Sequence, residues 1–154
     1  MIFIEINQNL KVNLAHEIFE KASLAAIKEG PARGEADLTV VITDNKTLRK
    51  LNKQFREIDG ETDVLSFSSD ETDPDSGNKY LGDVIISYPQ ALDQAVQAGH
   101  PVENELQLLT VHGVLHLIGF DHNDIDEKAR MWEAQEAALI KLGMHGIKIM
   151  DDQE

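Results

Sequence analysis

Hydrophobic side chains follow two different periods along the chain, and these periods predict its secondary structure. Ile2, Ile4 and Ile6 alternate with other residues, which is the period-two pattern of a β-strand. Short apolar and β-branched runs predict three further strands, over residues 38–42, 64–67 and 80–87. Hydrophobic positions spaced by three or four residues predict helices, over residues 11–28, 45–57, 89–98, 102–117 and 124–142.

The order of these elements predicts the fold class. Two β–α units come first, which favours parallel pairing of their strands through right-handed crossovers. Residues 68–78, between the last two predicted strands, are mostly Ser, Asp, Pro and Gly, so we expect a mobile loop that allows these strands to pair antiparallel. We therefore predict an α/β (α+β) fold with a mixed four-stranded sheet and about five helices. The 154 residues fit one domain, with a frayed tail over residues 146–154.

Composition then narrows the class of protein. Hydrophobic residues make up 42% and charged residues 27% of the chain, which is ordinary for a globular protein. No stretch approaches the ~18 consecutive apolar residues of a membrane span, so we expect no membrane association and a cytoplasmic location. Because the chain has no cysteine, any metal ligand must be His, Asp or Glu. The net charge of −14 means that a nucleic-acid partner would need a local basic patch.

Three histidines stand close together in the most apolar part of the sequence. His112 and His116 are four residues apart, so they share one face of the predicted helix 102–117 and can bind the same ion at ~2.0–2.1 Å. Gly119 can end this helix and turn the chain so that His122 completes the set. The alternative is ordinary hydrogen-bonded histidines, but unpartnered imidazoles in a buried helix would cost roughly 1–3 kcal/mol each. We therefore predict one divalent metal ion at the end of a central buried helix.

Three protein ligands leave one position of a tetrahedral ion open, which is the arrangement of catalytic rather than structural sites. Zn²⁺ is the first expectation, although imidazole also suits Ni²⁺, copper and iron. The histidine spacing also matches the metalloprotease pattern H-E-x-x-H-x-x-G-x-x-H, but Gly113 occupies the position of the general base and argues against peptide hydrolysis. A general base would have to come from elsewhere in the chain. Asp121 and Asp83 are candidates for this base, or for a side chain that orients a metal ligand. For Asp121, capping of a turn is an equal alternative.

A basic stripe lies along the predicted helix 45–57. Its five members recur at helical spacing and are Lys46, Arg49, Lys50, Lys53 and Arg56. We expect the opposite, inner side to carry the apolar residues Leu48, Leu51, Phe55 and Ile58. A solvated face is the usual explanation of such a charge run. In this acidic chain, however, the stripe is where the phosphates of a nucleic acid could bind.

Three stretches of the sequence resemble one known family. They are ELQLLTVHGVLHLIGFDH over residues 105–122, the Leu-Asn to Phe-Arg segment over residues 51–56, and TDVLSF over residues 62–67. In order, spacing and overall length they resemble the YbeY-type bacterial endoribonucleases from about residue 2 to 145.

This resemblance implies an α/β protein that is a metal-dependent endoribonuclease specific for single-stranded RNA. It implies a role in ribosomal RNA maturation and ribosome quality control, with the small ribosomal subunit as a partner. It also implies that His112, His116 and His122 bind zinc or a similar ion, and that Arg56 serves catalysis or RNA binding. Whether the nucleophile is water or the 2′-hydroxyl of RNA stays open.

Two other functions fit the residues considered alone. One is a metallohydrolase of small molecules or peptides, and the other is a ribosome-assembly binding module with a structural metal. The basic stripe favours RNA over the first. The set of three histidines, without an evident fourth protein ligand, argues against the second.

Overall fold

The computed structural model describes residues 1–31 and 35–144, so the predicted frayed tail lies outside the described residues. In that part of the chain the elements are β1 (Ile2–Ile6), the 3₁₀ turn η1 (Gln8–Leu10), α1 (His16–Ile27), β2 (Ala36–Thr43), α2 (Asn45–Arg56), β3 (Val64–Ser68), β4 (Lys79–Ser87), α3 (Tyr88–Ala98), α4 (Val102–Leu117) and α5 (Ile125–Lys141). The predicted mixed sheet of four strands with five α-helices is confirmed. No helix among the described residues is long and apolar enough to cross a membrane.

The sheet has the strand order β1-β2-β4-β3. Strand β2 pairs parallel with both β1 and β4, and β3 runs antiparallel to β4, as the element order predicted. The register places Ile4 opposite Val40, Val40 opposite Val84, and Val84 opposite Ser66. Because alternate residues of a strand point to opposite faces, this row defines one face of the sheet.

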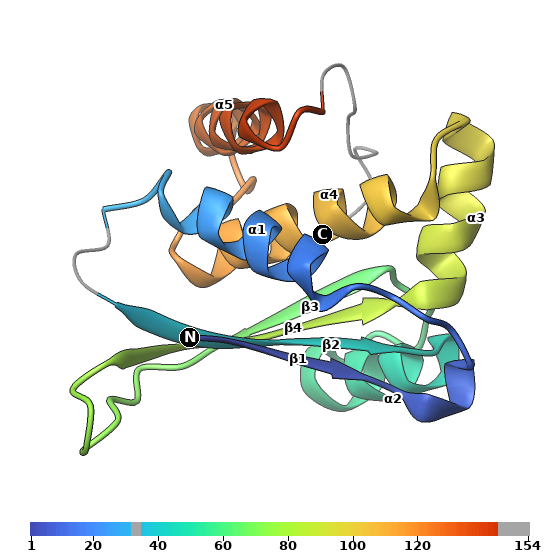
Figure 1. Ribbon diagram of the computed structural model, residues 1–154, viewed down its shortest axis with the longest axis horizontal. Helices are drawn as coiled ribbons and strands as arrows, with labels where there is room; N and C mark the ends of the chain where they lie inside the picture. The colour runs from blue at the N-terminus through green and yellow to red at the C-terminus, as the bar shows by residue number, and fades with distance from the viewer. Residues whose placement is uncertain (32–34, 145–154) are drawn as a thin grey trace.

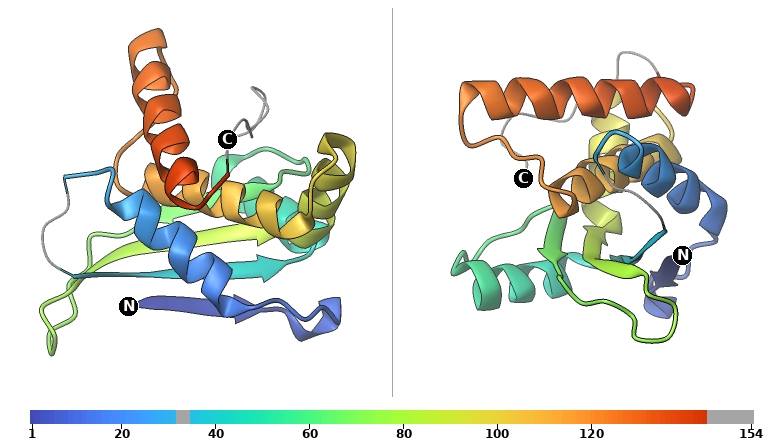
Figure 2. Two further views of the ribbon diagram at one scale, coloured as in Figure 1. Left: turned by 45° about the horizontal axis from the view of Figure 1, so that its top comes forward. Right: turned by 90° about the vertical axis from the view of Figure 1, so that its left-hand side faces the viewer.

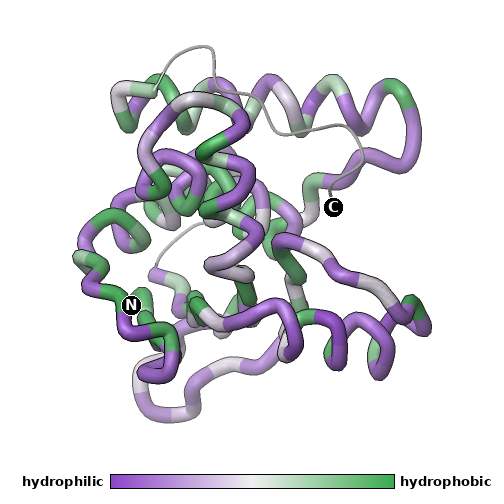
Figure 3. The backbone as a smooth tube through the Cα atoms, turned by 90° about the vertical axis from the view of Figure 1, so that its right-hand side faces the viewer, coloured by the Kyte–Doolittle hydropathy of each residue, from purple (hydrophilic) through white to green (hydrophobic). Residues whose placement is uncertain are grey.

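The helices are distributed unequally over the two faces of the sheet (Figure 1). Helices α1 and α4 cover one face, and α5 packs outside them, whereas α2 lies on the opposite face (Figure 2). Eleven of the sixteen residues of α4 are buried, which makes it the central helix of the core. Helix α2, by contrast, is mostly hydrophilic, as its tube low in the view shows (Figure 3).

Two segments differ from the prediction. Helix α1 begins at His16, not at residue 11, because Lys11 has a positive φ of 52° and the Asn7 side chain caps the 3₁₀ turn. The predicted loop 68–78 continues the β3–β4 hairpin, since the Tyr80 amide donates to the Glu71 carbonyl at 2.8 Å. Its mobility stays a prediction.

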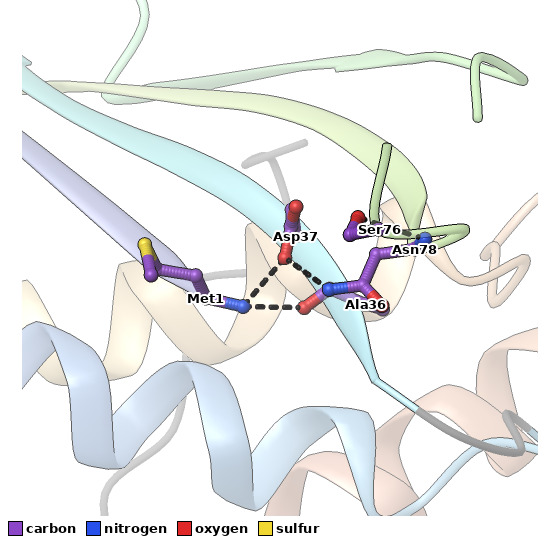
Figure 4. Close-up of polar contacts among 5 residues, drawn as sticks. All are labelled: Met1, Ala36, Asp37, Ser76 and Asn78. Atoms are coloured by element: carbon purple, nitrogen blue, oxygen red, sulfur yellow. Dashed lines mark hydrogen bonds and ion pairs between the residues drawn. The ribbon is translucent and has the colours of Figure 1, made fainter. Parts of the chain in front are cut away.

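The end of this hairpin is attached to the neighbouring strand (Figure 4). The Asn78 side-chain amide donates to the Asp37 carboxylate at 3.4 Å, and the amino group of Met1 donates to the same oxygen at 2.6 Å. These contacts connect the start of β4 to the starts of β1 and β2.

Candidate metal centre

The three predicted ligands meet where α4 ends. His112 and His116 lie one turn apart on α4, and their Nε2 atoms are 3.2 Å apart. Beyond Leu117 the chain reverses at Gly119, whose φ of 108° is one that side-chain-bearing residues rarely adopt. This reversal brings the His122 ring to 5.2 Å from the His116 ring, measured between ring centroids. One ring nitrogen from each histidine lies within 4.8 Å of the other two, so the group could hold a metal ion.

The protonation of the histidines fits metal binding. Burial, followed by the proximity of His116, lowers the pKa of His112 to about 3. Burial, followed by the proximity of His122, lowers the pKa of His116 to about 4. Neutral imidazole is the form that binds a metal. The Nε2 atom of His122 is buried with no hydrogen-bond partner among the described residues, which an ion at the centre of the group would supply.

Helix α5 contributes two residues that the sequence analysis missed. The Nδ1 atom of His112 lies 3.0 Å from the buried Oε1 atom of Gln135, so this nitrogen carries the proton and Nε2 offers its lone pair to the group. The Trp132 ring stands edge-on to the rings of His112 and His122, with centroids 5.9 Å away in both cases. The only available sequence signal was their spacing of three residues on a helix next to the histidine segment.

Gly113 cannot act as a general base, and it also has a packing role. A Cβ atom at this position would lie 2.5 Å from Cγ1 of Val84, and the Ser66 hydroxyl donates to the Gly113 carbonyl at 2.9 Å. The glycine therefore lets α4 approach β3 and β4 closely. The residue that corresponds to the general base of metalloproteases is therefore Gly113, and the space that a side chain would need there is filled by Val84 of the sheet.

Asp121 and Asp83, the two predicted candidates for a base, lie in different places. The carboxylate of Asp121 accepts hydrogen bonds from the His122 amide and the Asn123 side chain, both at 2.8 Å, which is the turn-capping arrangement. Asp83 precedes Val84, which faces α4, so its side chain points to the opposite face of the sheet. There it accepts a hydrogen bond from the Tyr80 hydroxyl. The expectation that Asp83 acts beside the histidines is therefore wrong.

A hollow of about 610 Å³ opens beside the histidines. It is lined by Phe55, Arg56, Ser66, Phe67, Ser68, His116, Asp121, His122 and Asn123. Arg56 thus shares one hollow with two of the three predicted metal ligands. Its positive charge also contributes to the lowered pKa of His116.

The basic stripe of α2 reaches this hollow only at its end. Of its five members, Arg56 lines the hollow and the other four, Lys46, Arg49, Lys50 and Lys53, do not. All five are exposed. Arg49 forms an ion pair with Asp59 at 2.8 Å, and the adjacent Asp59 carboxylate raises its pKa.

The inner side of α2 differs from the prediction. Its buried residues are Leu48 and Asn52, whereas Phe55 and Ile58 are 60% and 54% exposed. Asn52 was not predicted: its side chain donates to the Gly60 carbonyl at 3.1 Å and so fixes the turn that follows Arg56.

Comparison with known proteins decides the family. The family model described as "Endoribonuclease YbeY" matches residues 3–143. The chain belongs to the YbeY endoribonuclease family. Endoribonucleases are hydrolases that cut phosphodiester bonds within RNA, so the resemblance of the three sequence stretches is confirmed.

Individual relatives cover most of the chain. A Moorella thermoacetica protein named "Endoribonuclease YbeY" is 43% identical over an alignment of 127 positions, which covers 78% of this chain and 81% of the relative. A Clostridium botulinum protein of the same name is 37% identical and covers 94% of this chain and 99% of its own. The solution structure of TM1509 from Thermotoga maritima matches with a TM-score of 0.55 and 23% identity, over 100% of this chain and 99% of that one. This last similarity supports the fold.

Proposed function

We propose that this YbeY family member is a metal-dependent endoribonuclease that cuts single-stranded RNA in the hollow between α2 and α4. One observation carries the proposal: Arg56 lines the same hollow as His116 and His122. A cation-binding group and a phosphate-binding group thus face one space that is open to a polymer. By its family resemblance, the protein acts in ribosomal RNA maturation and ribosome quality control, in the cytoplasm, with the small ribosomal subunit as its partner.

The metal ion in this proposal is held by His112, His116 and His122. Three neutral imidazoles in a group of this size fit Zn²⁺ first, and Ni²⁺ or another transition metal second. A divalent ion bound there would supply Lewis-acid stabilisation of phosphate charge and a water of lowered pKa. Gln135 keeps His112 in the tautomer that such an ion requires.

Arg56 binds the phosphate of the cleaved bond. Its guanidinium group can donate two parallel hydrogen bonds to phosphate oxygens and stabilise the negative charge that grows during cleavage. The turn fixed by Asn52 holds the end of α2, and hence Arg56, in place at the hollow. The rest of the stripe binds phosphates farther along the strand, with Lys53 one helical turn from Arg56.

Asp121 has a positioning role in this account. Both of its carboxylate oxygens already accept hydrogen bonds, from the His122 amide and from Asn123. The residue therefore orders the loop that carries His122, the third ligand. We do not propose that Asp121 removes a proton from the substrate.

The test compares two arginines of the same helix. Arg56→Ala removes the guanidinium group at the hollow, whereas Arg49→Ala removes one that faces Asp59 outside it. We expect metal-loaded Arg56→Ala to lose about 100-fold or more in cleavage of single-stranded RNA, and Arg49→Ala to lose only a few-fold. Equal cleavage by both variants, or preferential cleavage of a duplex or a peptide by the wild type, would contradict the proposal.

A further inference from the structure

Phe55 is the exposed aromatic residue of the hollow. Its side chain follows Leu48 by two helical turns, so it continues the inner face of α2, yet it is 60% exposed while Leu48 is fully buried. Its ring packs edge-on against Phe67 on the edge strand β3, with ring centroids 5.4 Å apart and planes at 65°. Helix α2 therefore carries Phe55 to the edge of the sheet, where one ring supports it and solvent reaches the remainder.

The neighbours of Phe55 determine what this exposed ring can contact. Phe55 and Arg56 are consecutive, and both line the hollow that also contains His116 and His122. In a nucleotide, a single ribose separates the base from its own phosphate. A phosphate bound by Arg56 therefore leaves an adjacent base within reach of Phe55.

We propose that Phe55 is a platform on which one unpaired base of the RNA stacks, next to the phosphate that Arg56 binds. This inference rests on the proposed function and adds a base-binding position to it. Every base has an aromatic face, so such a platform accepts any base. A base inside a duplex is already stacked on both sides and cannot present its face. Phe55 thus provides a physical reason for a preference for single strands.

The binding measurements use metal-free protein, in which cleavage is suppressed, and short single-stranded RNA oligonucleotides. Phe55→Leu keeps an apolar side chain and removes the ring, whereas Phe55→Tyr keeps the ring. We expect Phe55→Leu to weaken binding by roughly 5- to 100-fold, the range that base–aromatic stacking supplies, and Phe55→Tyr to bind nearly as the wild type does. The salt dependence of binding should not change in Phe55→Leu, because the phosphate contacts remain.

A set of oligonucleotides, each lacking one base, locates the stacked position. For the wild type, one abasic position should weaken binding as much as Phe55→Leu does, and the same oligonucleotide should bind Phe55→Leu without further loss. The wild-type series needs no variant, so it tests the proposal even if Phe55→Leu does not fold. Wild-type binding that is insensitive to every abasic position, or Phe55→Leu binding equal to wild type, would overturn the platform.

These results are distinguishable from failure of the proposed function. If metal-loaded wild type cuts single-stranded RNA but Phe55→Leu binds and cuts equally well, the platform alone is wrong. If metal-loaded wild type cuts no RNA, the proposed function is wrong. If Phe55→Leu instead loses a protein partner while RNA binding is unchanged, Phe55 is a protein contact and the base platform is rejected.

Discussion

The Nδ1 atom of His112 lies 3.0 Å from the side-chain oxygen of Gln135, although the two residues are 23 positions apart. This contact makes α5 part of the candidate metal centre, because it decides which nitrogen of His112 carries the proton. Without it, a buried N–H group of the ring would lack an acceptor. The capacity of these α4 histidines to hold a metal ion would therefore depend on the packing of α5.

Substitution of Gln135 should weaken metal binding. We expect Gln135→Leu to lower the affinity for Zn²⁺ by roughly 10- to 100-fold, as is typical when the acceptor behind a metal-binding histidine is lost. Gln135→Glu keeps an acceptor and should retain most of the affinity. Competition with a chromogenic chelator measures the difference. The matched control is Gln97→Leu on the exposed side of α3; equal affinities for Gln135→Leu and this control would remove Gln135 from the metal centre.

Gly113 should tolerate no side chain. We expect Gly113→Ala to reduce the free energy of unfolding by about 1–3 kcal/mol, because its methyl group would collide with Val84. Urea denaturation measures this loss. Gly60→Ala is the control, since the nearest atom to a Cβ there is 3.8 Å away. Val84→Ala should cost less stability in Gly113→Ala than in the wild type, because it removes the colliding group; if the double variant is less stable by the full sum of both changes, the collision is not the cause.

The features that were predicted correctly from sequence depend on local spacing. His112 and His116 share a face because four residues make about one helical turn, and Gly119 could be recognised as the residue that reverses the chain. The strands and their pairing followed from short apolar runs and from the lengths of the segments between them. These properties involve neighbours along the chain.

The features that were missed or wrong depend on contacts between distant segments. Period two shows that Asp83 and Val84 face opposite sides of the sheet, but not which side α4 covers. The helical pattern of α2 placed Phe55 on the inner side, but did not show that this position lies at the edge strand β3, where the ring contacts Phe67 and stays 60% exposed. Gln135 reaches His112 only through the packing of α5 on α4. A single sequence does not specify these placements.

Glu105 should make stability depend on pH. Its side chain is buried, and Oε2 has no hydrogen-bond partner among the described residues, with the Nε2 atom of His100 at 3.6 Å. Burial, followed by repulsion from Asp63, raises the pKa of Glu105 to about 7, above its ordinary value of 4.5. Between these values the folded state binds more protons than the unfolded state. The contribution of Glu105 to stability is therefore fully present below about pH 4.5 and falls as the pH rises through 7.

Glu105→Gln removes this titration. We expect the free energy of unfolding of Glu105→Gln, relative to wild type, to increase between pH 5 and pH 8 by at most ~1.4 kcal/mol per pH unit. Chemical denaturation across this range measures the difference, and Glu103→Gln, exposed on the same helix, should show none. If the difference between Glu105→Gln and wild type does not vary with pH, Glu105 is ionised throughout.

The most direct test of the central claim measures metal content and RNA cleavage on the same samples of wild type and His116→Ala. We predict one transition-metal ion per wild-type chain with cleavage of single-stranded RNA, and loss of both in His116→Ala. Restored metal should restore cleavage to stripped wild type but not to the variant. Cleavage of single-stranded RNA at the wild-type rate by His116→Ala, or by metal-free wild type, would contradict the account.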